Sequence, residues 1–442
     1  MRKKYDLIVV GAGPAGAMAA KTAAEIGLNT LLLERKKDPS KLTRGCASMF
    51  AIESDYYFGE RMYYNDKNKK MVFPVNGFTV DYDGPRRNYY AWHFYAPNGK
   101  TCLKFGNYEK SFKEGDAGRL SFVFNKGYLI SSLLTKAEKF GAKILTGKYV
   151  EKVGKGKKYV KVQSGKDFFE GTFLIGADGM NSIIAEQMGF NKERLFFGRN
   201  SGITYYLTGT AIPQSEAIIS GHAFKSNSSF HSFFWIIPSP YEKDEFWFAV
   251  KTPQEFDFIT KESVYKRWFP NLRIRRRVGF VTNMRSPVSE PFKDNVLLAG
   301  DSAWFWEAEI TGSMMCGWKA ANSIAEAFRN NKLNRDGIIS YINWWKKSYA
   351  DFDDYRNMFL LIPFCNIFTE EELNYLFGLF RKPLRRTNNP FLIVRLVKNA
   401  LKPLIPKIQK EMPSIIKKMD MLEVENIQKF TGIKQFFKKR KS

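Results

Sequence analysis

The stretch Tyr5-Asp-Leu-Ile-Val-Val-Gly11-Ala-Gly13-Pro-Ala-Gly16 decides the fold of this chain. Its first six residues predict a buried parallel strand, and residues 17–26 predict a helix directly after the glycines. Gly11 permits a tight turn, Gly13 lets the backbone approach a pyrophosphate, and Gly16 lets the helix pack closely on the strand. The sequence therefore predicts a Rossmann-like dinucleotide-binding unit near the start of the chain.

An acidic residue follows this motif at the spacing that nucleotide-binding folds use. A second strand, residues 29–33, ends at Glu34, which lies 18 residues after Gly16. A carboxylate there can accept hydrogen bonds from ribose hydroxyls. The two strands, the helix and the acid predict a dinucleotide site, but they do not choose between FAD and NAD.

Two later segments favour FAD. Residues 173–177 predict a strand that ends at Asp178-Gly179, and residues 295–299 predict another that ends at Gly300-Asp301, with a helix after Thr311-Gly312. An aspartate at such a strand end can bind a ribityl hydroxyl, and the N-terminus of the following helix can stabilise negative charge on a reduced flavin.

The three segments, in this order, resemble the FAD-binding scaffold shared by para-hydroxybenzoate hydroxylase, flavin-dependent halogenases and geranylgeranyl reductases. The resemblance covers about residues 1–330 and is specific for FAD and the fold. Arg44-Gly45-Cys46 and Phe233-Phe-Trp235-Ile-Ile-Pro238 look most like the geranylgeranyl reductase branch. Lys126 stands where that family usually has an arginine, which keeps a cation but loses bidentate phosphate contact. Phe233 and Ile237 also depart from the branch, and residues 304–312 lack its usual proline.

The resemblance implies that FAD is held by small and charged residues in these segments and in the loops between them. The expected cofactor-binding residues are Gly11, Gly13, Pro14, Ala15, Gly16, Glu34, Arg35, Arg44, Gly45, Cys46, Lys126, Asp178, Gly179, Gly300, Asp301, Thr311, Gly312 and Ser313.

Candidate catalytic groups are few. If Cys46 lies near the flavin, as the resemblance implies, its thiol could give a proton after hydride transfer or pair with Cys316. Glu307 and Glu309 could act as general acids or hold a polar substrate. The alternative for each cysteine is a small buried hydrophobic side chain, and the alternative for each glutamate is an exposed acid on a loop.

Aromatic residues predict where an apolar substrate binds. Phe233 and Trp235 project to the same face of a predicted strand. With Pro238 and with Trp92, which lies in the unusually aromatic segment 49–105, they are the expected substrate-binding residues. Large planar side chains suit an apolar, unsaturated or aromatic substrate. They could equally pack an ordinary sheet core.

The charge of the chain is strongly positive and unevenly distributed. The net charge is +26, and residues 381–442 hold 17 Lys or Arg against 4 acids, interleaved with apolar residues. This pattern suits an anionic membrane surface, with a solvated basic tail as the alternative. No groove-reading or stacking motif indicates nucleic acid. The three histidines are far apart in sequence and no metal site is expected.

Four cysteines without paired spacing and no long apolar run predict a cytoplasmic protein, with peripheral contact at the inner face of the cell membrane left open. We expect an α/β, Rossmann-like FAD-binding domain interleaved with an antiparallel β-sheet substrate domain, plus a helical basic C-terminal region. The expected FAD-binding domain takes residues 1–60, 111–200 and 286–345, the substrate domain 61–110 and 201–285, and the C-terminal region 346–442.

The leading expectation for function, which rests on the resemblance, is an FAD-dependent oxidoreductase that reduces carbon–carbon double bonds of an isoprenoid or other lipid-like substrate. One alternative is a monooxygenase or halogenase that acts on an aromatic substrate. Another is a non-catalytic flavoprotein or electron relay that docks on a membrane or an acidic partner. A second nucleotide motif is not evident, so ferredoxin, a reductase or transiently bound NAD(P)H is the expected electron donor.

Overall fold

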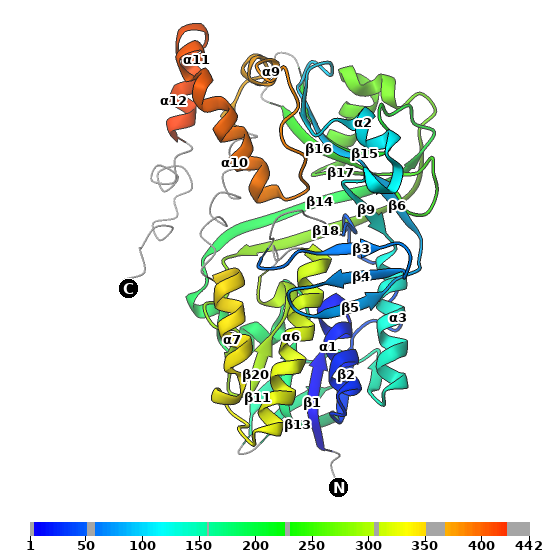
Figure 1. Ribbon diagram of the computed structural model, residues 1–442, viewed down its shortest axis with the longest axis vertical. Helices are drawn as coiled ribbons and strands as arrows, with labels where there is room; N and C mark the ends of the chain where they lie inside the picture. The colour runs from blue at the N-terminus through cyan, green and yellow to red at the C-terminus, as the bar shows by residue number, and fades with distance from the viewer. Residues whose placement is uncertain are drawn as a thin grey trace.

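The structure is a computed structural model that describes residues 4–50, 58–156, 159–225, 230–304, 309–350 and 367–421. Two large sheets dominate it, one in the lower half and one across the upper half of Figure 1. Helices cover both, and the helices nearest the C-terminus stand beside the upper sheet. The expected α/β class with a second, largely antiparallel sheet is confirmed.

The lower sheet carries the N-terminal motif and has eight strands among the described residues. They run in the order β10 (Lys143–Thr146), β2 (Thr30–Glu34), β1 (Lys4–Val10), β13 (Asp167–Gly176), β12 (Val160–Ser164) and β11 (Lys152–Lys155), with β20 (Val296–Leu298) beside β13 and β19 (Phe292–Lys293) beside β20. The strands β10, β2, β1, β13 and β20 pair in parallel.

Their carboxyl ends therefore meet at one edge of the sheet. Val10 leads there into the glycine loop, Gly176 leads to Asp178, and Leu298 leads to Asp301. Because β2 and β13 lie on opposite sides of β1, this edge is the point where ligands bind in open parallel sheets.

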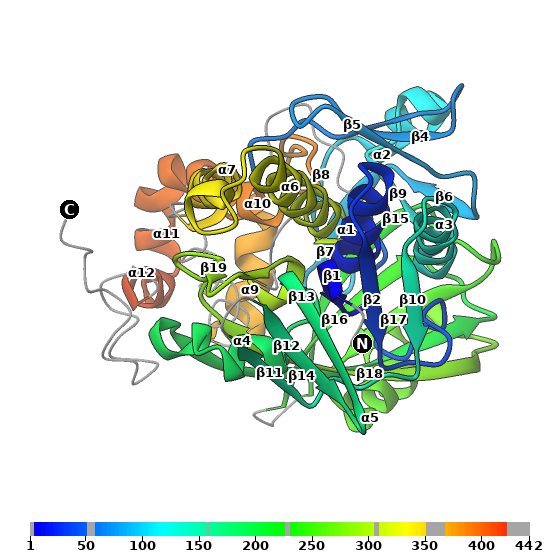
Figure 2. The same ribbon diagram turned by 90° about the horizontal axis from the view of Figure 1, so that it is seen from below.

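Helices α1 (Pro14–Glu25), α3 (Lys126–Lys139) and α6 (Glu309–Arg329) lie side by side along this sheet (Figure 2). A Cβ at Gly317 of α6 would lie 2.1 Å from the carbonyl oxygen of Ala15, so only glycine lets the two helices approach this closely. Two helices begin earlier than expected: α1 begins at Pro14, and α6 begins at Glu309, before Thr311 and Gly312. Pro14 suits a first helical turn because its missing N–H has no partner there.

The upper sheet has seven strands among the described residues. Their order is β18 (Arg273–Arg285), β14 (Phe196–Thr208), β17 (Phe246–Val250), β16 (His231–Pro238), β15 (Ala217–Phe224), β7 (Ala91–Tyr95) and β8 (Cys102–Phe105). All neighbours are antiparallel except β15 and β7. One face packs on α5 (Pro253–Asp257) and two short helical turns, η3 (Phe258–Glu262) and η4 (Val264–Trp268).

Residues 61–90 do not join the upper sheet, contrary to expectation. β3 (Tyr63–Asn65), β4 (Lys70–Phe73) and β5 (Phe78–Asp81) form a separate sheet, and β6 (Arg86–Tyr89) pairs with β9 (Ser121–Phe124). The buried face of β3–β5 packs into the lower core, where Phe78 stacks on Trp318 of α6 at 4.9 Å. Alternation predicts a strand but does not say which core receives its apolar face. The division into an FAD-binding and a substrate domain stays a prediction.

The C-terminal layer consists of α9 (Glu370–Gly378), α10 (Pro390–Leu401), η8 (Lys402–Leu404), α11 (Ile405–Glu411) and α12 (Pro413–Met421). Prolines stand in the first turns of its helices, at Pro390, Pro403, Pro406 and Pro413. The remaining elements are α2 (Tyr108–Lys113), α4 (Ile183–Gln187), α7 (Ile339–Trp345) and the turns η1 (Gly115–Ala117), η2 (Phe190–Glu193), η5 (Gly300–Ser302), η6 (Asp336–Ile338) and η7 (Lys346–Ala350). Within the described ranges, no helix is long and apolar enough to cross a membrane.

Candidate active site

A cavity of about 1070 Å³ joins the two sheets. It starts at the glycine loop, passes residues 42–47 and extends over the upper sheet to the C-terminal layer. A typical small-molecule pocket measures roughly 300–1,000 Å³, so the volume suits a cofactor together with a substrate.

The glycine loop forms one end of the cavity. Gly11 has a φ of 99°, and a Cβ there would lie 2.3 Å from the carbonyl oxygen of Ala177. A Cβ at Gly16 would lie 1.8 Å from the carbonyl oxygen of Gly11. Gly13 differs, because a Cβ there would meet no atom within 4 Å and would point into open space. The N-terminus of α1 and the open position at Gly13 fit a pyrophosphate.

Glu34 is a buried anchor beside this loop. Its Oε2 accepts a hydrogen bond from the backbone N–H of Ala12 at 2.7 Å, and its Oε1 accepts one from the backbone N–H of Lys36 at 2.7 Å. Arg35 and Lys36 line the cavity next to it. Burial lowers the pKa of the Lys36 ammonium.

Asp178 provides a second test of whether a cofactor fits. Its Oδ2 accepts hydrogen bonds from the backbone N–H groups of Ile183 at 2.9 Å and Ile184 at 3.3 Å. Its Oδ1 is buried and has no hydrogen-bond partner among the described residues, and burial raises the pKa of the carboxyl. A buried carboxylate oxygen on a cavity wall needs a donor, and a ligand hydroxyl would supply it. Gly179 opens onto the same space.

Arg44 and Asp301 close the cavity wall between the two halves of the site. Arg44 Nη2 lies 3.2 Å from Asp301 Oδ2, which links the segment after β2 to the turn after β20. Pro14, Ala15, Gly45 and Ser313 also line the cavity, whereas Gly16, Gly300, Thr311 and Gly312 do not. Those last four shape the turns and helix starts behind the wall.

The two candidate general acids, Glu307 and Glu309, differ in what the structure describes. Glu307 lies outside the described residues, and Glu309 is known only as the first residue of α6. No structural support for a role of either carboxylate follows from the described part of the chain.

Cys46 lies at the middle of the cavity wall. Its Sγ accepts a hydrogen bond from the backbone N–H of Ser48 at 3.4 Å, and Lys126 Nζ lies 3.9 Å away. Lys126 opens α3, with the Asn125 side chain as N-cap. Cys316 is fully buried in the lower core and does not line the cavity. A pairing of Cys316 with Cys46 stays a prediction.

The far part of the cavity is apolar and aromatic. Trp92, Phe233 and Trp235 line it as expected side chains of β7 and β16, and Trp92 meets Trp235 edge to face at 6.1 Å. Ser220 accepts a hydrogen bond from the Trp92 indole at 2.9 Å, which fixes that ring. Pro238 ends β16 and does not line the cavity.

The opposite wall comes from the C-terminal layer, which the sequence interpretation did not assign to the site. Apolar side chains of α9, of α10 and of the segment between them cover this part of the cavity: Leu376, Phe377, Phe380, Ile393, Val394, Val397 and Leu401. The signal was present, because residues 391–401 repeat apolar side chains at helical spacing. From sequence alone, the same alternation of apolar and basic residues indicates a membrane-binding surface.

Two histidines within the apolar part were also missed. His222 Nδ1 and His231 Nε2 lie 3.0 Å apart, and both residues line the cavity. Burial, with the neighbouring ring of His231, lowers the pKa of His222 to about 3. The His222 imidazole is therefore neutral at ordinary pH. The two histidines form no recognisable motif in the sequence. The described residues contain no cluster of three or more His, Cys, Asp or Glu that could hold a metal ion.

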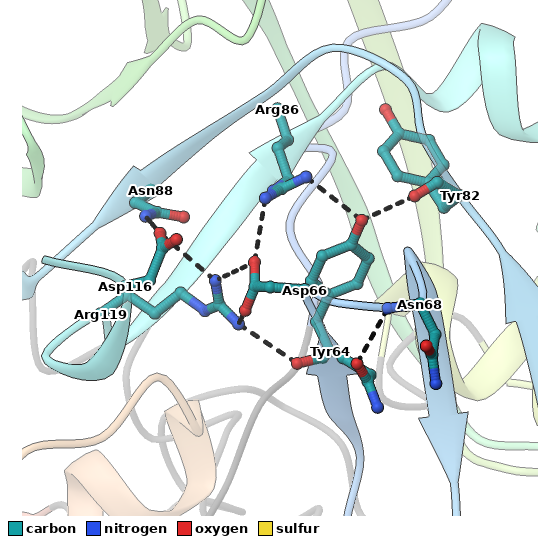
Figure 3. A network of polar contacts seen from close by, with 9 residues as sticks. Tyr64, Asp66, Asn68, Tyr82, Arg86, Asn88, Asp116 and Arg119 are labelled. Carbon is teal, nitrogen blue, oxygen red and sulfur yellow. Dashed lines mark hydrogen bonds and ion pairs between the residues drawn. The ribbon is translucent and has the colours of Figure 1, made fainter.

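A polar network supports the wall near Cys46 (Figure 3). Asp66 accepts hydrogen bonds from Arg119, at 2.6 and 2.9 Å, and from Arg86 at 2.9 Å. Arg86 also donates to the Tyr64 hydroxyl at 3.2 Å, and that hydroxyl donates to the carbonyl of Tyr82 at 2.7 Å. These bonds tie β3 and β6 to Arg119, two residues before β9.

β9 in turn holds the segment that follows Cys46. The carbonyl of Ser48 accepts a hydrogen bond from the backbone N–H of Phe124 at 2.9 Å, and the N–H of Phe50 donates to the carbonyl of Phe122 at 3.1 Å. The backbone two and four residues after the cysteine is thus held by β9, the partner strand of β6.

Comparison with known proteins agrees with this geometry. The model of an FAD binding domain matches residues 4–54. The digeranylgeranylglycerophospholipid reductase of Methanosarcina acetivorans is 24% identical over 393 residues, which cover 84% of this chain and 87% of that protein. A probable electron transfer flavoprotein-quinone oxidoreductase of Escherichia coli strain K12 is 30% identical over 188 residues, 42% of this chain and 39% of that protein.

Among solved structures, a geranylgeranyl bacteriochlorophyll reductase-like protein from Thermoplasma acidophilum has a similar fold. The TM-score is 0.67 at 16% identity, with 95% of this chain and 99% of that chain covered. The chain is thus an FAD-dependent oxidoreductase. Over most of its length it is similar to digeranylgeranylglycerophospholipid reductases.

Proposed function

We propose that this protein uses reduced FAD to saturate carbon–carbon double bonds in the isoprenoid chain of a lipid. The observation that carries the proposal is the continuity of the cavity, which leads from the glycine loop past Cys46 to an aromatic and aliphatic compartment. Such a compartment excludes water and accepts a long hydrocarbon chain. The relatives named for digeranylgeranylglycerophospholipid reduction support the same substrate class.

The roles of individual residues follow from their places on the wall. The expected contacts to FAD are the glycine loop and Glu34 at the adenosine end, and Asp178, Arg44, Asp301 and Lys126 farther along the cavity. Bound in reduced form, the cofactor supplies a hydride to one carbon of the double bond. In this proposal Cys46 gives the proton that the other carbon requires, and the Lys126 ammonium, 3.9 Å from the sulfur, stabilises the sulfur as it loses that proton.

The substrate is held by apolar contact. Trp92, Phe233 and Trp235 provide one wall for the chain, and α9 and α10 provide the other. A hydride and a proton together add one hydrogen to each carbon, so each saturated bond gains the mass of two hydrogen atoms.

We also propose that the C-terminal layer rests on an anionic membrane from which the lipid enters. α10 turns Ile393, Val394 and Leu401 inward, while Arg395, Lys402, Lys407, Lys410 and Lys417 are exposed on this layer. An amphipathic, cationic surface of this kind binds anionic headgroups. The support is charge and geometry, and co-sedimentation with vesicles of phosphatidylserine and phosphatidylcholine tests it.

The function itself is tested by an anaerobic reoxidation experiment. The holoprotein is reduced with dithionite, and flavin absorbance is followed after addition of a digeranylgeranyl phospholipid or of air-saturated buffer. Fast reoxidation by the lipid, with a product heavier by two hydrogens per bond, is the expected result. Fast reoxidation by oxygen with a hydroxylated or halogenated aromatic product, and none by the lipid, would instead identify a monooxygenase or halogenase.

A further inference from the structure

A row of arginines stands on the outer edge of the upper sheet. Arg273, Arg275, Arg276 and Arg277 lie at the start of β18, the edge strand, and all four are exposed. We call them the β18 arginine row. The stretch 263–289 around it contains seven Lys or Arg and no Asp or Glu.

Few of these charges are neutralised by neighbours. Arg275 is paired with Glu242 at 3.2 Å, and both side chains are more than half exposed, so this pair is weak. Arg276 lies over the Tyr206 ring at 5.5 Å and donates a hydrogen bond to the carbonyl of Leu42. The row therefore presents a concentrated positive field to solvent.

The same strand connects this surface to the cofactor cavity. The carbonyl of Gly279 accepts a hydrogen bond from the N–H of Gly45 at 3.2 Å, and Phe280 and Thr282 line the cavity. Leu42, which Arg276 contacts, lines the cavity as well. One end of β18 is thus at the surface while its middle forms part of the wall beside Arg44 and Cys46.

We propose that the β18 arginine row is the docking surface for an acidic electron-transfer protein, which delivers reducing equivalents through the adjacent segment 42–46. The inference rests on the proposed reductase function, because each saturated bond consumes two electrons and two protons. A one-electron carrier, such as an acidic iron–sulfur protein, docks twice for each bond, and the protons come from solvent. Redox encounters of this kind use small interfaces that are guided by opposite charge.

The test compares two charge-reversed variants of the full-length holoprotein. R273E/R277E alters the row and leaves the cavity wall intact, since neither residue lines it. K152E/K166E alters two exposed lysines, one in β11 and one in the turn between β12 and β13, and changes net charge by the same amount. Flavin reduction by a reduced acidic ferredoxin is followed anaerobically by stopped flow, and binding of the oxidised ferredoxin is measured by calorimetry.

We expect R273E/R277E to lower the second-order reduction rate and the affinity by about tenfold or more at low salt, while K152E/K166E changes either by about twofold at most. The difference should vanish at about 0.5 M salt, where charges are screened. Reduction by dithionite should be the same in all three proteins.

Equal effects of the two variants, or none at any salt concentration, would overturn the proposal and leave the row as an edge that only discourages strand pairing. Loss of binding to anionic vesicles with unchanged ferredoxin kinetics would also overturn it, in favour of a membrane contact. Failure of the reductase function is separately visible, because the dithionite-reduced wild type would then not be reoxidised by the lipid.

Discussion

Lys126 Nζ lies 3.9 Å from Cys46 Sγ, at the point where the cofactor end of the cavity meets its apolar part. We expect Cys46→Ala to lower lipid reduction by about 100-fold or more, because general acid catalysis typically contributes that much. The variant should still bind FAD, measured by the flavin-to-protein absorbance ratio. Cys102→Ala is the control, since Cys102 lies off the cavity wall; an equal loss there would contradict a specific role of Cys46.

The glycine loop predicts a contrast between two substitutions. Gly13→Ala places its Cβ in open space, so the apoprotein should keep its Tm while FAD affinity falls at least about tenfold. Gly16→Ala collides with the carbonyl of Gly11, so the Tm of the apoprotein itself should fall by several degrees. Thermal unfolding and FAD titration measure the two effects, and an unstable Gly13→Ala apoprotein would refute the open-position interpretation.

The network in Figure 3 predicts a pH-dependent contribution to stability. The hydrogen bond from Arg119 lowers the pKa of Asp66 despite partial burial, and the charges of Arg119 and Arg86 act in the same direction. A depressed folded-state pKa gives stability that is present above the ordinary pKa of about 4 and is lost as pH falls through the folded value.

Asp66→Asn should therefore lower Tm by a few degrees at pH 7, and the gap to wild type should narrow below about pH 4. Asp116→Asn changes an exposed member of the same network and should have a smaller effect. If the difference in Tm between Asp66→Asn and wild type stays constant from neutral to acidic pH, the charge of Asp66 does not contribute to stability.

The position of α10 predicts control over substrate length. Val397→Trp fills the apolar part of the cavity, so turnover of long isoprenoid chains should fall by about tenfold while short chains are less affected. Asn399→Trp adds the same ring on the exposed side of the helix and should change neither. Competition assays with prenyl substrates of two lengths give the ratio, and an unchanged ratio in Val397→Trp would place the chain elsewhere.

Local patterns predicted the cofactor end of this protein well. Gly11, Gly13, Glu34 and Asp178 lie within three strand–turn units whose geometry is set by residues near one another in sequence. FAD as cofactor and the oxidoreductase class agree with the comparisons. The individual contacts to FAD remain predictions.

The packing of elements that are far apart in sequence could not be predicted from local patterns. The strands β3–β5 alternate as strands should, yet nothing in residues 63–81 says that Phe78 stacks on Trp318 rather than joining the upper sheet. The placement of α10 over the cavity depends on its apolar face joining one hydrophobic cluster with Trp92 and Trp235, which are far away in sequence. The pairing of His222 with His231 depends on strand register, which no motif records.

The inward face of α10 has a thermodynamic consequence. Ile393, Val394 and Val397 of this helix line the cavity. A bound hydrocarbon chain would therefore complete the hydrophobic core of the C-terminal layer, and each molecule bound would stabilise that layer by mass action. Release of the saturated lipid then takes away apolar contacts that help to order the last helices. The free energy of product release therefore includes the cost of losing this stabilisation of the C-terminal layer.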